Sequence, residues 1–400
     1  MGPRVGRWRA YVAATLLSVA GCAPGPGGGP HTAMRDSAGV IIVTSDLVHV
    51  IARDPPVCSL STEPTVTIGA ATGAPEYQFY RVFGAITLSD GTIVVLNQGS
   101  SQLRFFDGKG RFRHQTGSHG DGPGEFRNAF GLWVLPGDTI WAGDYGAWRF
   151  QVFDRTGGWV RTVRPATPYP ASPDITVVLR SGLFVLGDFK SRWQSRPGYH
   201  PAQIDLLLHA KNGALIDTLM TLGYGVWGMA TPAFAFHRLF ESFAMAAGSG
   251  DQLVVGQGGS PEVSVFRVTG ESVRLDRIIR FTISDRTVTA QDIAAERRRV
   301  IGTYFELEAR RAEIPTAAEV PAFEGLRMGR DGRIWIKEYA RDRSRRQYTW
   351  LSFGPDGAFE CRLELPPFRQ IFEIGADYIL VLNVDDLGVE RVQRYELVVH

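Results

Sequence analysis

An internal repeat is the feature of this chain that most constrains its fold. A group of residues that begins at Phe83 returns 47 residues later, beginning at Phe130. The two copies share the pairs Phe83-Gly84 and Phe130-Gly131, the turns Asp90-Gly91-Thr92 and Gly137-Asp138-Thr139, the polar residues Asn97 and Asp144, and the pairs Phe106-Asp107 and Phe153-Asp154. The same frame returns more weakly in four later segments, near residues 175, 244, 325 and 372. Six copies at this period indicate a repeat architecture.

Each copy contains short runs rich in Val, Ile and aromatic residues, separated by Gly, Asp-Gly or Pro. Such runs, for example 92–96 and 333–336, are typical of strands of about five residues joined by tight turns. Four strands in a copy of about 45 to 50 residues match one blade of a β-propeller. The sequence therefore predicts an all-β fold, a six-bladed β-propeller with four-stranded blades. A β-sandwich is disfavoured, because it has no reason to repeat its sequence six times.

The last copy contains only three strands, so another segment must complete it. The segment Pro64 to Ile68 corresponds to the outer strand of the first copy. Pairing this N-terminal strand with the last blade would close the ring and remove an open sheet edge. We therefore expect the N-terminal strand to close the last blade.

The beginning of the chain has the pattern of an export signal. Arginines precede an apolar run, from Ala10 to Ala20, that is too short to span a bilayer. Val19-Ala20-Gly21-Cys22 resembles the lipobox of bacterial lipoproteins, which implies cleavage before Cys22 and lipidation of that cysteine; an ordinary signal peptide is the alternative. We predict a signal peptide at 1–21, the lipidated Cys22 with a flexible tether at 22–36, and the propeller at 37–400.

The net charge and the cysteines bear on which binding partners and which cellular compartment to expect. The net charge of +2 gives no reason to expect nucleic acid. The predicted location is the bacterial cell envelope, facing the periplasm or the exterior, and we expect a monomer whose membrane contact is the lipid anchor. Cys58 and Cys361 would be free to pair in an oxidising compartment, but the sequence does not decide whether they do.

One segment departs from the strand pattern. Between Thr289 and Glu313 an apolar stripe recurs at helical spacing, after a capping sequence from Thr289 to Asp292. We predict a helix at 289–313 within an insertion at 286–321. The helix would pack flat on the propeller, or serve as a lid or a partner-binding element.

The second copy carries a family resemblance. Asp144-Tyr-Gly-Ala-Trp-Arg149-Phe-Gln-Val-Phe-Asp154 resembles the NHL repeat, and the glycine-rich connection Gly117 to Phe126 is similar to the connection in that family. With Ser37 to Val43, the pattern also resembles exported bacterial six-bladed propellers of unassigned function. The resemblance implies the fold, and it introduces metal-dependent lactonases and lyases as alternatives.

Polar residues end the second strand of each copy in one register. Equivalent positions in a ring share one rim, so these residues would surround one opening of the channel. Together with two following tyrosines they are the candidate ligand-binding residues: Asn97, Asp144, Tyr145, Asp188, Gln257, Glu338, Tyr339 and Asn383. Such residues also cap hairpins, which is the alternative interpretation.

Catalysis has no sharp support in the sequence. The histidines are scattered, and no nucleophile motif is present. The glycine-rich connection precedes no helix, so it is interpreted as a turn that needs glycine and not as a phosphate site. We therefore expect a small molecule, glycan or peptide to bind at one face of the channel. A metal-dependent hydrolase, lactonase or lyase is the first alternative and a protein interaction scaffold the second; the sequence identifies neither a cofactor nor a ligand.

Overall fold

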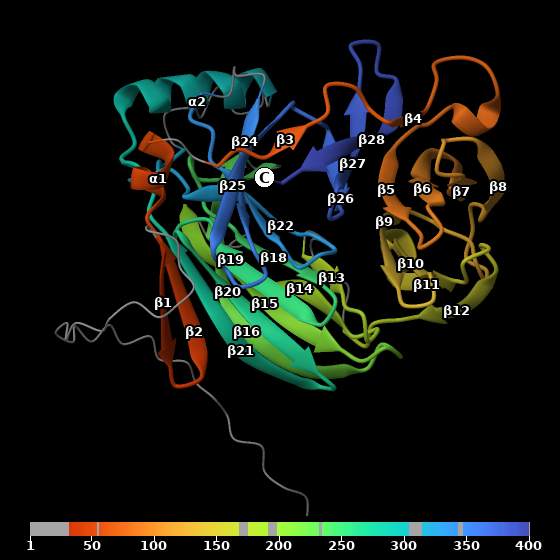
Figure 1. Ribbon diagram of the computed structural model, residues 1–400, viewed down its shortest axis with the longest axis horizontal. Coiled ribbons are helices and arrows are strands. Elements are labelled where there is room, and N and C mark those ends of the chain that lie inside the picture. Colours follow the sequence, from red (N-terminus) through yellow and green to blue (C-terminus); the bar gives the residue numbers. More distant parts are fainter. Residues whose placement is uncertain are drawn as a thin grey trace, which may run out of the picture.

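The computed structural model describes residues 32–53, 56–167, 175–190, 198–231, 234–303, 314–342 and 347–399. Six sheets of these residues follow one another in a ring, and they are antiparallel except for one parallel pair in the fourth (Figure 1). The first two are β5 (Val82–Thr87), β6 (Ile93–Asn97), β7 (Gln102–Phe106) and β8 (Phe112–Thr116), then β9 (Ala129–Leu135), β10 (Thr139–Asp144), β11 (Arg149–Phe153) and β12 (Trp159–Val163). The third is β13 (Thr176–Val178), β14 (Phe184–Lys190), β15 (Tyr199–His209), β16 (Leu215–Thr231) and β17 (Phe234–His237).

The remaining three sheets complete the ring. The fourth contains β18 (Ala244–Ser249), β19 (Gln252–Gln257), β20 (Glu262–Thr269) and β21 (Ser272–Phe281). The fifth contains β22 (Phe323–Met328), β23 (Ile334–Glu338), β24 (Tyr348–Phe353) and β25 (Phe359–Leu365). The sixth contains β26 (Gln370–Ile374), β27 (Tyr378–Val384) and β28 (Glu390–Val398). The predicted six-bladed propeller is confirmed.

The ring closes as the sequence predicts. Strand β4 (Val66–Ile68) pairs antiparallel with β28, with Ile68 opposite Val392. The short β3 (Ser59–Leu60) pairs with the end of the same strand. The first strands of neighbouring blades lie side by side, since β26 contacts β5, β5 contacts β9, β13 contacts β18, and β18 contacts β22. These first strands line the centre of the ring.

Apolar packing between neighbouring blades forms the core. Each of the six blade junctions holds its own cluster of buried side chains. Trp141 from the second blade packs on Phe184 from the third, with ring centroids 6.0 Å apart, and both side chains are fully buried. Burying such aromatic surface stabilises each junction. This repeated packing explains why the apolar frame recurs in all six copies.

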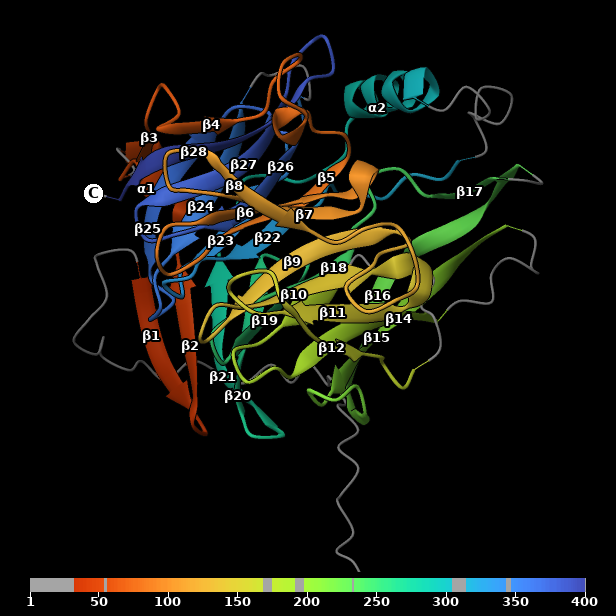
Figure 2. The same cartoon turned by 90° about the vertical axis from the view of Figure 1, so that its right-hand side faces the viewer.

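The fourth blade is wider than the repeat predicts. Strand β2 (Val40–Ser45) pairs parallel with β21, and β1 (Thr32–Ser37) pairs antiparallel with β2. These two strands form a hairpin on the outer edge of the blade (Figures 1 and 2). The predicted tether at 22–36 is therefore too long, because residues 32–36 are part of β1. Residues 1–31, including Cys22, lie outside the described residues.

Two helices accompany the sheets, and short 3-10 turns lie at Pro75–Tyr77, Gln98–Ser100 and Tyr145–Ala147. Helix α1 (Leu47–Arg53) follows β2, and α2 (Ala290–Thr303) lies between the fourth and fifth blades in the chain. The predicted capping sequence is confirmed, since the Asp292 N–H donates to Thr289 Oγ1 at 3.1 Å and the Thr289 N–H to Asp292 Oδ2 at 2.9 Å. The predicted continuation to Glu313 lies outside the described residues.

Cys58 and Cys361 form a disulfide, with Cα atoms 5.5 Å apart. It links the segment before β4 to the outer strand of the fifth blade, so it connects two parts of the chain that are 303 residues apart.

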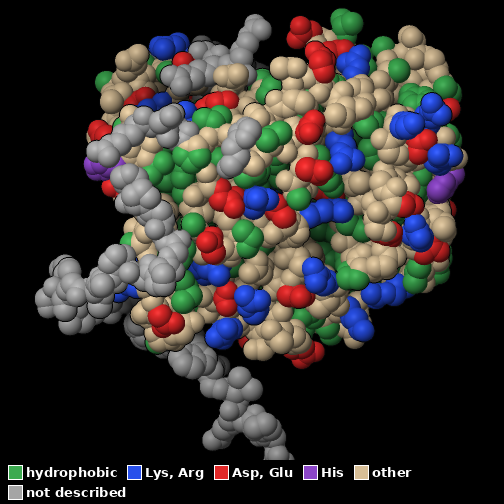
Figure 3. All heavy atoms as spheres, viewed as in Figure 1, with side chains coloured by type: hydrophobic (Ala, Val, Ile, Leu, Met, Phe, Trp, Pro, Cys, Tyr) green, Lys and Arg blue, Asp and Glu red, His purple; other side chains and the backbone are tan. Residues whose placement is uncertain are grey.

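Charged side chains of both signs are interspersed on the face shown in Figure 3. Among the described residues, no helix combines the length and apolar character needed to cross a membrane.

Candidate functional site

A cavity of about 600 Å³ lies at one mouth of the central channel. Its floor comes from the first strands of the fourth, fifth and sixth blades, through residues of β18, β22 and β26. The residues that end the second strands lie at this same end, because Gln257 pairs with Ala244 at the start of β18 and Glu338 with Phe323 at the start of β22. The cavity therefore opens at the rim that the sequence singles out.

Helix α2 and the third blade roof this cavity. Glu296 and Arg299 of α2 line it, as do residues that follow β17. Val300 is 1% exposed and packs in a cluster that includes Phe236 and Phe240. In both ribbon views α2 lies at one end of the molecule, outside the sheets (Figures 1 and 2). The helix thus packs on the propeller and also covers the channel mouth.

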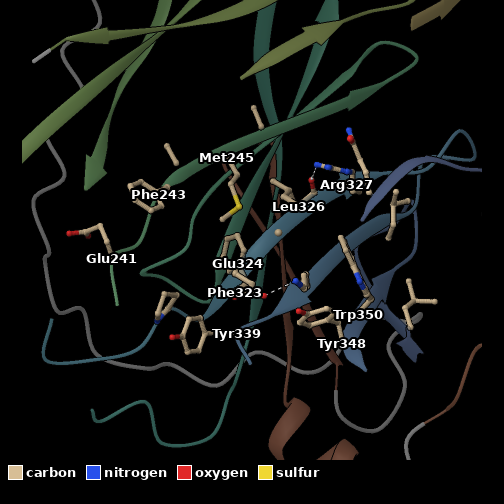
Figure 4. Close-up of a pocket in the computed structure, with 18 of the residues that line it drawn as sticks. Glu241, Phe243, Met245, Phe323, Glu324, Leu326, Arg327, Tyr339, Tyr348 and Trp350 are labelled. Atoms are coloured by element: carbon tan, nitrogen blue, oxygen red, sulfur yellow. Dashed lines mark hydrogen bonds and ion pairs between the residues drawn. The ribbon is translucent and has the colours of Figure 1, made fainter. Parts of the chain in front are cut away.

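Aromatic and apolar side chains provide much of the cavity wall. The close-up shows Phe243, Met245, Phe323, Tyr339, Tyr348 and Trp350 around the open space (Figure 4). Glycine at 325 permits this arrangement, because a Cβ there would lie 2.9 Å from the Lys337 Cβ. The volume and the lining are typical of a site for a small organic molecule.

The carboxylates of the lining are each paired with a cation. Glu324 lies 2.7 Å from Lys337 Nζ, which also lies over the Tyr348 ring. Glu296 pairs with Arg299 at 2.5 Å on α2. Glu241 pairs with Arg238 at 2.7 Å and accepts the Val226 N–H. The negative charge of the lining is therefore compensated locally.

Arg327 is different from these paired groups. It lies on β22 beside the cavity, and its side chain is exposed where the cavity opens to the channel (Figure 4). Nη1 donates to the carbonyl of Leu326 at 3.1 Å, and among the described residues no carboxylate pairs with Arg327.

His237 is the histidine of the cavity lining, and it adds no positive charge at neutral pH. Burial lowers its pKa from 6.5, although its hydrogen bond with the Arg238 carbonyl acts in the opposite direction. Its ring also contacts Trp227 and Phe243, with centroids 5.4 and 5.2 Å away. His237 therefore acts as an aromatic element of the wall.

A second cavity, of about 850 Å³, lies beside the first and shares Tyr339 and Pro321 with it. It is mostly polar and contains Glu338, Arg362 and Glu364. Burial raises the pKa of the Glu338 carboxyl from 4.5, with Arg362 opposing and Glu364 reinforcing that shift. Arg362 is itself engaged with Glu364 at 2.7 Å.

The structure does not bring the eight predicted ligand-binding residues together around one cavity. Tyr339 lines both cavities and Glu338 lines the second; the other six line neither. Tyr145 makes ring contacts with Phe130 and Trp148, Asp188 pairs with Lys190 at 2.5 Å, Gln257 donates to the Gly223 carbonyl at 3.3 Å, and Asn383 donates to Gln393 at 3.1 Å. A common register places these residues at one rim without directing their side chains to one point.

Asn97 and Asp144 are structural residues, although neither side chain caps the turn that follows it, as the alternative interpretation expected. Asn97 is 2% exposed and accepts the Tyr80 N–H at 2.9 Å. Asp144 is fully buried and accepts the N–H groups of Arg127 and Asn128 at 3.1 and 2.9 Å. Both side chains therefore fix the entry to the first strand of their blade.

Buried side chains of the third strands hold the loops that join the blades. Arg149 pairs with Asp144 at 3.0 Å and donates to the carbonyls of Gly120, Asp121 and Glu125. Arg104 in the first blade donates to three carbonyls of the preceding connection, at 2.9 to 3.1 Å. Gly120 and Gly124 adopt positive φ, as expected for a glycine turn. The motif that carries the family resemblance thus has a structural role, because its arginine holds the loop between the blades in place.

The sequence reasoning missed the residues of the cavity wall. Ile86 and Trp133 occupy the position of Arg327 in the first and second blades, as the strand register shows. The available signal was an arginine at a position of the first strand that is apolar in the first four blades, although the sixth blade has Glu373 there. The roof could not be found in this way, because its residues come from the third blade and the helical insertion.

In the described part of the chain, no three His, Cys, Asp or Glu side chains lie close enough together to hold a metal ion.

Comparisons with known proteins agree with the architecture. Residues 81–138 match the family model described as 6-bladed beta-propeller. The structure of this chain is likewise a six-bladed β-propeller. No curated protein sequence matches it.

Several solved structures resemble this propeller at low sequence identity. A candidate exported protein of Bacteroides fragilis is 12% identical, with a TM-score of 0.49 over 86% of this chain and 96% of that one. A Bacteroides vulgatus protein is 9% identical, with a TM-score of 0.47 over 87% of this chain and 100% of the other. Virginiamycin B lyase from Staphylococcus aureus is 10% identical, with a TM-score of 0.37 over 84% and 88%.

Proposed function

We propose that this propeller is an envelope binding protein that holds a small organic molecule in the cavity at the channel mouth. The observation that carries the proposal is the partly open cavity of about 600 Å³ with aromatic walls, placed under a helix at one rim. Ligand sites commonly have this size and combine apolar walls with a few polar groups. This proposal keeps the predicted face of the channel but replaces most of the predicted contact residues.

A variant that fills the cavity tests this function. Met245→Trp places a larger side chain into the space next to Phe323 (Figure 4). The matched control is Leu387→Trp, because Leu387 is 88% exposed and lies outside both cavities. Compounds from a chemically varied library that raise the unfolding temperature of the unaltered protein should lose this effect in Met245→Trp and keep it in Leu387→Trp. Equal effects in both variants would contradict the proposal.

The proposed location is the bacterial cell envelope, with Cys22 as the lipid anchor and an NHL-like repeat as the structural family. The lipobox-like Val19 to Cys22 supports the anchor, and the disulfide between Cys58 and Cys361 suits an oxidising compartment. Cys22→Ser should release the protein from the membrane fraction into a soluble exported pool. Retention of this variant in membranes after a high-salt wash would contradict the anchor.

A further inference from the structure

Among the described residues that line the channel-mouth cavity, the charges do not balance. These residues include three carboxylates, Glu241, Glu296 and Glu324, and each lies within an ion pair described above. Two cations remain, Arg327 and Arg369, for which the described residues offer no carboxylate partner. His237 does not change this balance, since burial favours its neutral form. The described part of the lining therefore has a surplus of positive charge.

Arg327 is the stronger of these two cations as a ligand contact. It lies on a central strand that is fixed on both sides, since β22 pairs with β23 and lies beside β18. Its guanidinium is exposed to the cavity and has no carboxylate partner among the described residues. An anion in the cavity can therefore pair with it directly. A guanidinium can also hold a carboxylate or phosphate through two parallel hydrogen bonds.

The other side chains of the cavity wall indicate the chemistry of the uncharged part of the ligand. Phe243, Tyr339 and Tyr348 present aromatic surface to the same space as Arg327, and the buried Phe323 and Trp350 lie behind them (Figure 4). Such walls favour a planar or apolar body over a bare inorganic ion. We propose that the ligand is a small amphipathic anion, with a carboxylate or phosphate group at Arg327 and an apolar or aromatic body against these side chains. This inference rests on the proposed function of the cavity.

Matched compounds test the charge separately from the cavity. The probes are indole-3-acetate, its neutral amide, phenylacetate, phenylacetamide and phenyl phosphate, each titrated calorimetrically into the full-length protein. We expect the anions to bind at least about tenfold more tightly than the amides of the same body, which corresponds to about 1.4 kcal/mol. The comparison of carboxylates with phenyl phosphate tells which anionic group the site prefers.

The variants assign the effect to one side chain. Arg327→Gln should remove the preference for the anion and leave binding of the amide unchanged. Arg113→Gln is the matched control, because it removes the same charge from a side chain that is 62% exposed on the first blade. Arg327→Lys keeps the charge but lacks the planar guanidinium, so it should retain only part of the preference for the anion. This variant provides the test if Arg327→Gln does not fold.

Three results would overturn the inference, and they differ in what they say about the cavity. Equal affinity for acid and amide would reject the anionic ligand but leave a ligand-binding cavity in place. An anion preference that survives in both Arg327→Gln and Arg327→Lys, or falls equally in Arg113→Gln, would show that Arg327 does not hold the anion. No binding by any of the five compounds, together with no library compound sensitive to Met245→Trp, would reject both the anion site and the proposed function.

Discussion

At the scale of single residues, one sequence position serves different purposes in different blades. Asp144 and Asn97 are buried and hold backbone N–H groups, whereas Glu338 lines an open polar cavity. In the first two blades this polar residue holds the backbone where the first strand begins. In other blades it has other partners, such as Lys190 for Asp188 and Gln393 for Asn383. Only where the neighbouring loops leave space does this position reach solvent or a ligand.

Replacing Asp144 tests its structural role. Asp144→Ala leaves the buried Arg149 guanidinium without its partner, and it also leaves two backbone N–H groups without an acceptor. We expect the free energy of unfolding to fall by about 3 to 5 kcal/mol in chemical denaturation. Asp121→Ala is the control, because that carboxyl is 59% exposed and pairs with Arg127 at the surface, where an ion pair contributes at most about 1 kcal/mol. Similar losses for the two variants would contradict the structural role.

Glu338 gives the protein a specific pH dependence. Burial raises the pKa of its carboxyl from 4.5, so the folded protein holds this proton more tightly than the unfolded chain. Stability should therefore fall as pH rises from 4.5 through the folded pKa. Glu338→Gln removes that loss, and its unfolding temperature should exceed that of the unaltered protein at pH 7. The difference should vanish below pH 4.5; a difference independent of pH would contradict this account.

At the scale of elements, the insertion α2 acts as the roof of the cavity. Val300 attaches it to Phe236 and Phe240, and Arg341 binds Asp292 at its beginning at 2.7 Å. The helix is thus fixed at its start and along one face. Because its attachment is separate from the blade junctions, it can be loosened without unfolding the propeller.

Val300→Asp tests this independence. An aspartate in the apolar cluster would be buried without a partner, which costs several kcal/mol if the helix stays in place. We expect α2 to detach, so that its amides exchange hydrogen with solvent much faster while those of β22 and β26 remain protected. Ala294→Asp on the exposed side of the same helix should leave exchange unchanged. Faster exchange throughout the blades would contradict a separately attached roof.

The elements also show how far sequence reasoning reaches. The blades could be predicted because local strand patterns recur at a fixed period, and the closing strand followed from counting strands in the last copy. The β1–β2 hairpin could not be predicted in this way, because the parallel pairing of β2 with β21 joins Ile41 to Arg277 across most of the chain. The cavity could not be predicted for the same reason, because its lining residues Met245, Arg327 and Gln370 come from three different blades.

At the scale of the whole molecule, the ring is closed twice near its ends. Strand β4 completes the sixth blade, and the disulfide attaches the segment before it to the fifth. Both connections bring the start of the propeller to its end. A closed ring keeps the first strands at fixed distances, and so it keeps the cavity walls in place.

Removing the disulfide tests its share in closure. The double variant Cys58→Ser, Cys361→Ser should unfold at lower denaturant concentration, with a loss of about 2 to 4 kcal/mol, because the unfolded chain is no longer cross-linked. A reducing agent should destabilise the unaltered protein by a similar amount and leave the double variant unchanged. If the reducing agent had no effect on either protein, the disulfide would not contribute to closure.

The most direct test of the account is a crystal structure of the full-length protein purified from its own host and supplied with any small molecules released from it. We predict density for a small organic anion in the cavity at the channel mouth, with its charged group at Arg327 and its body against Phe243 and Tyr348. Density for the ligand in the polar cavity around Glu338, or on the outer strands, with the channel-mouth cavity holding only water, would contradict the central claim.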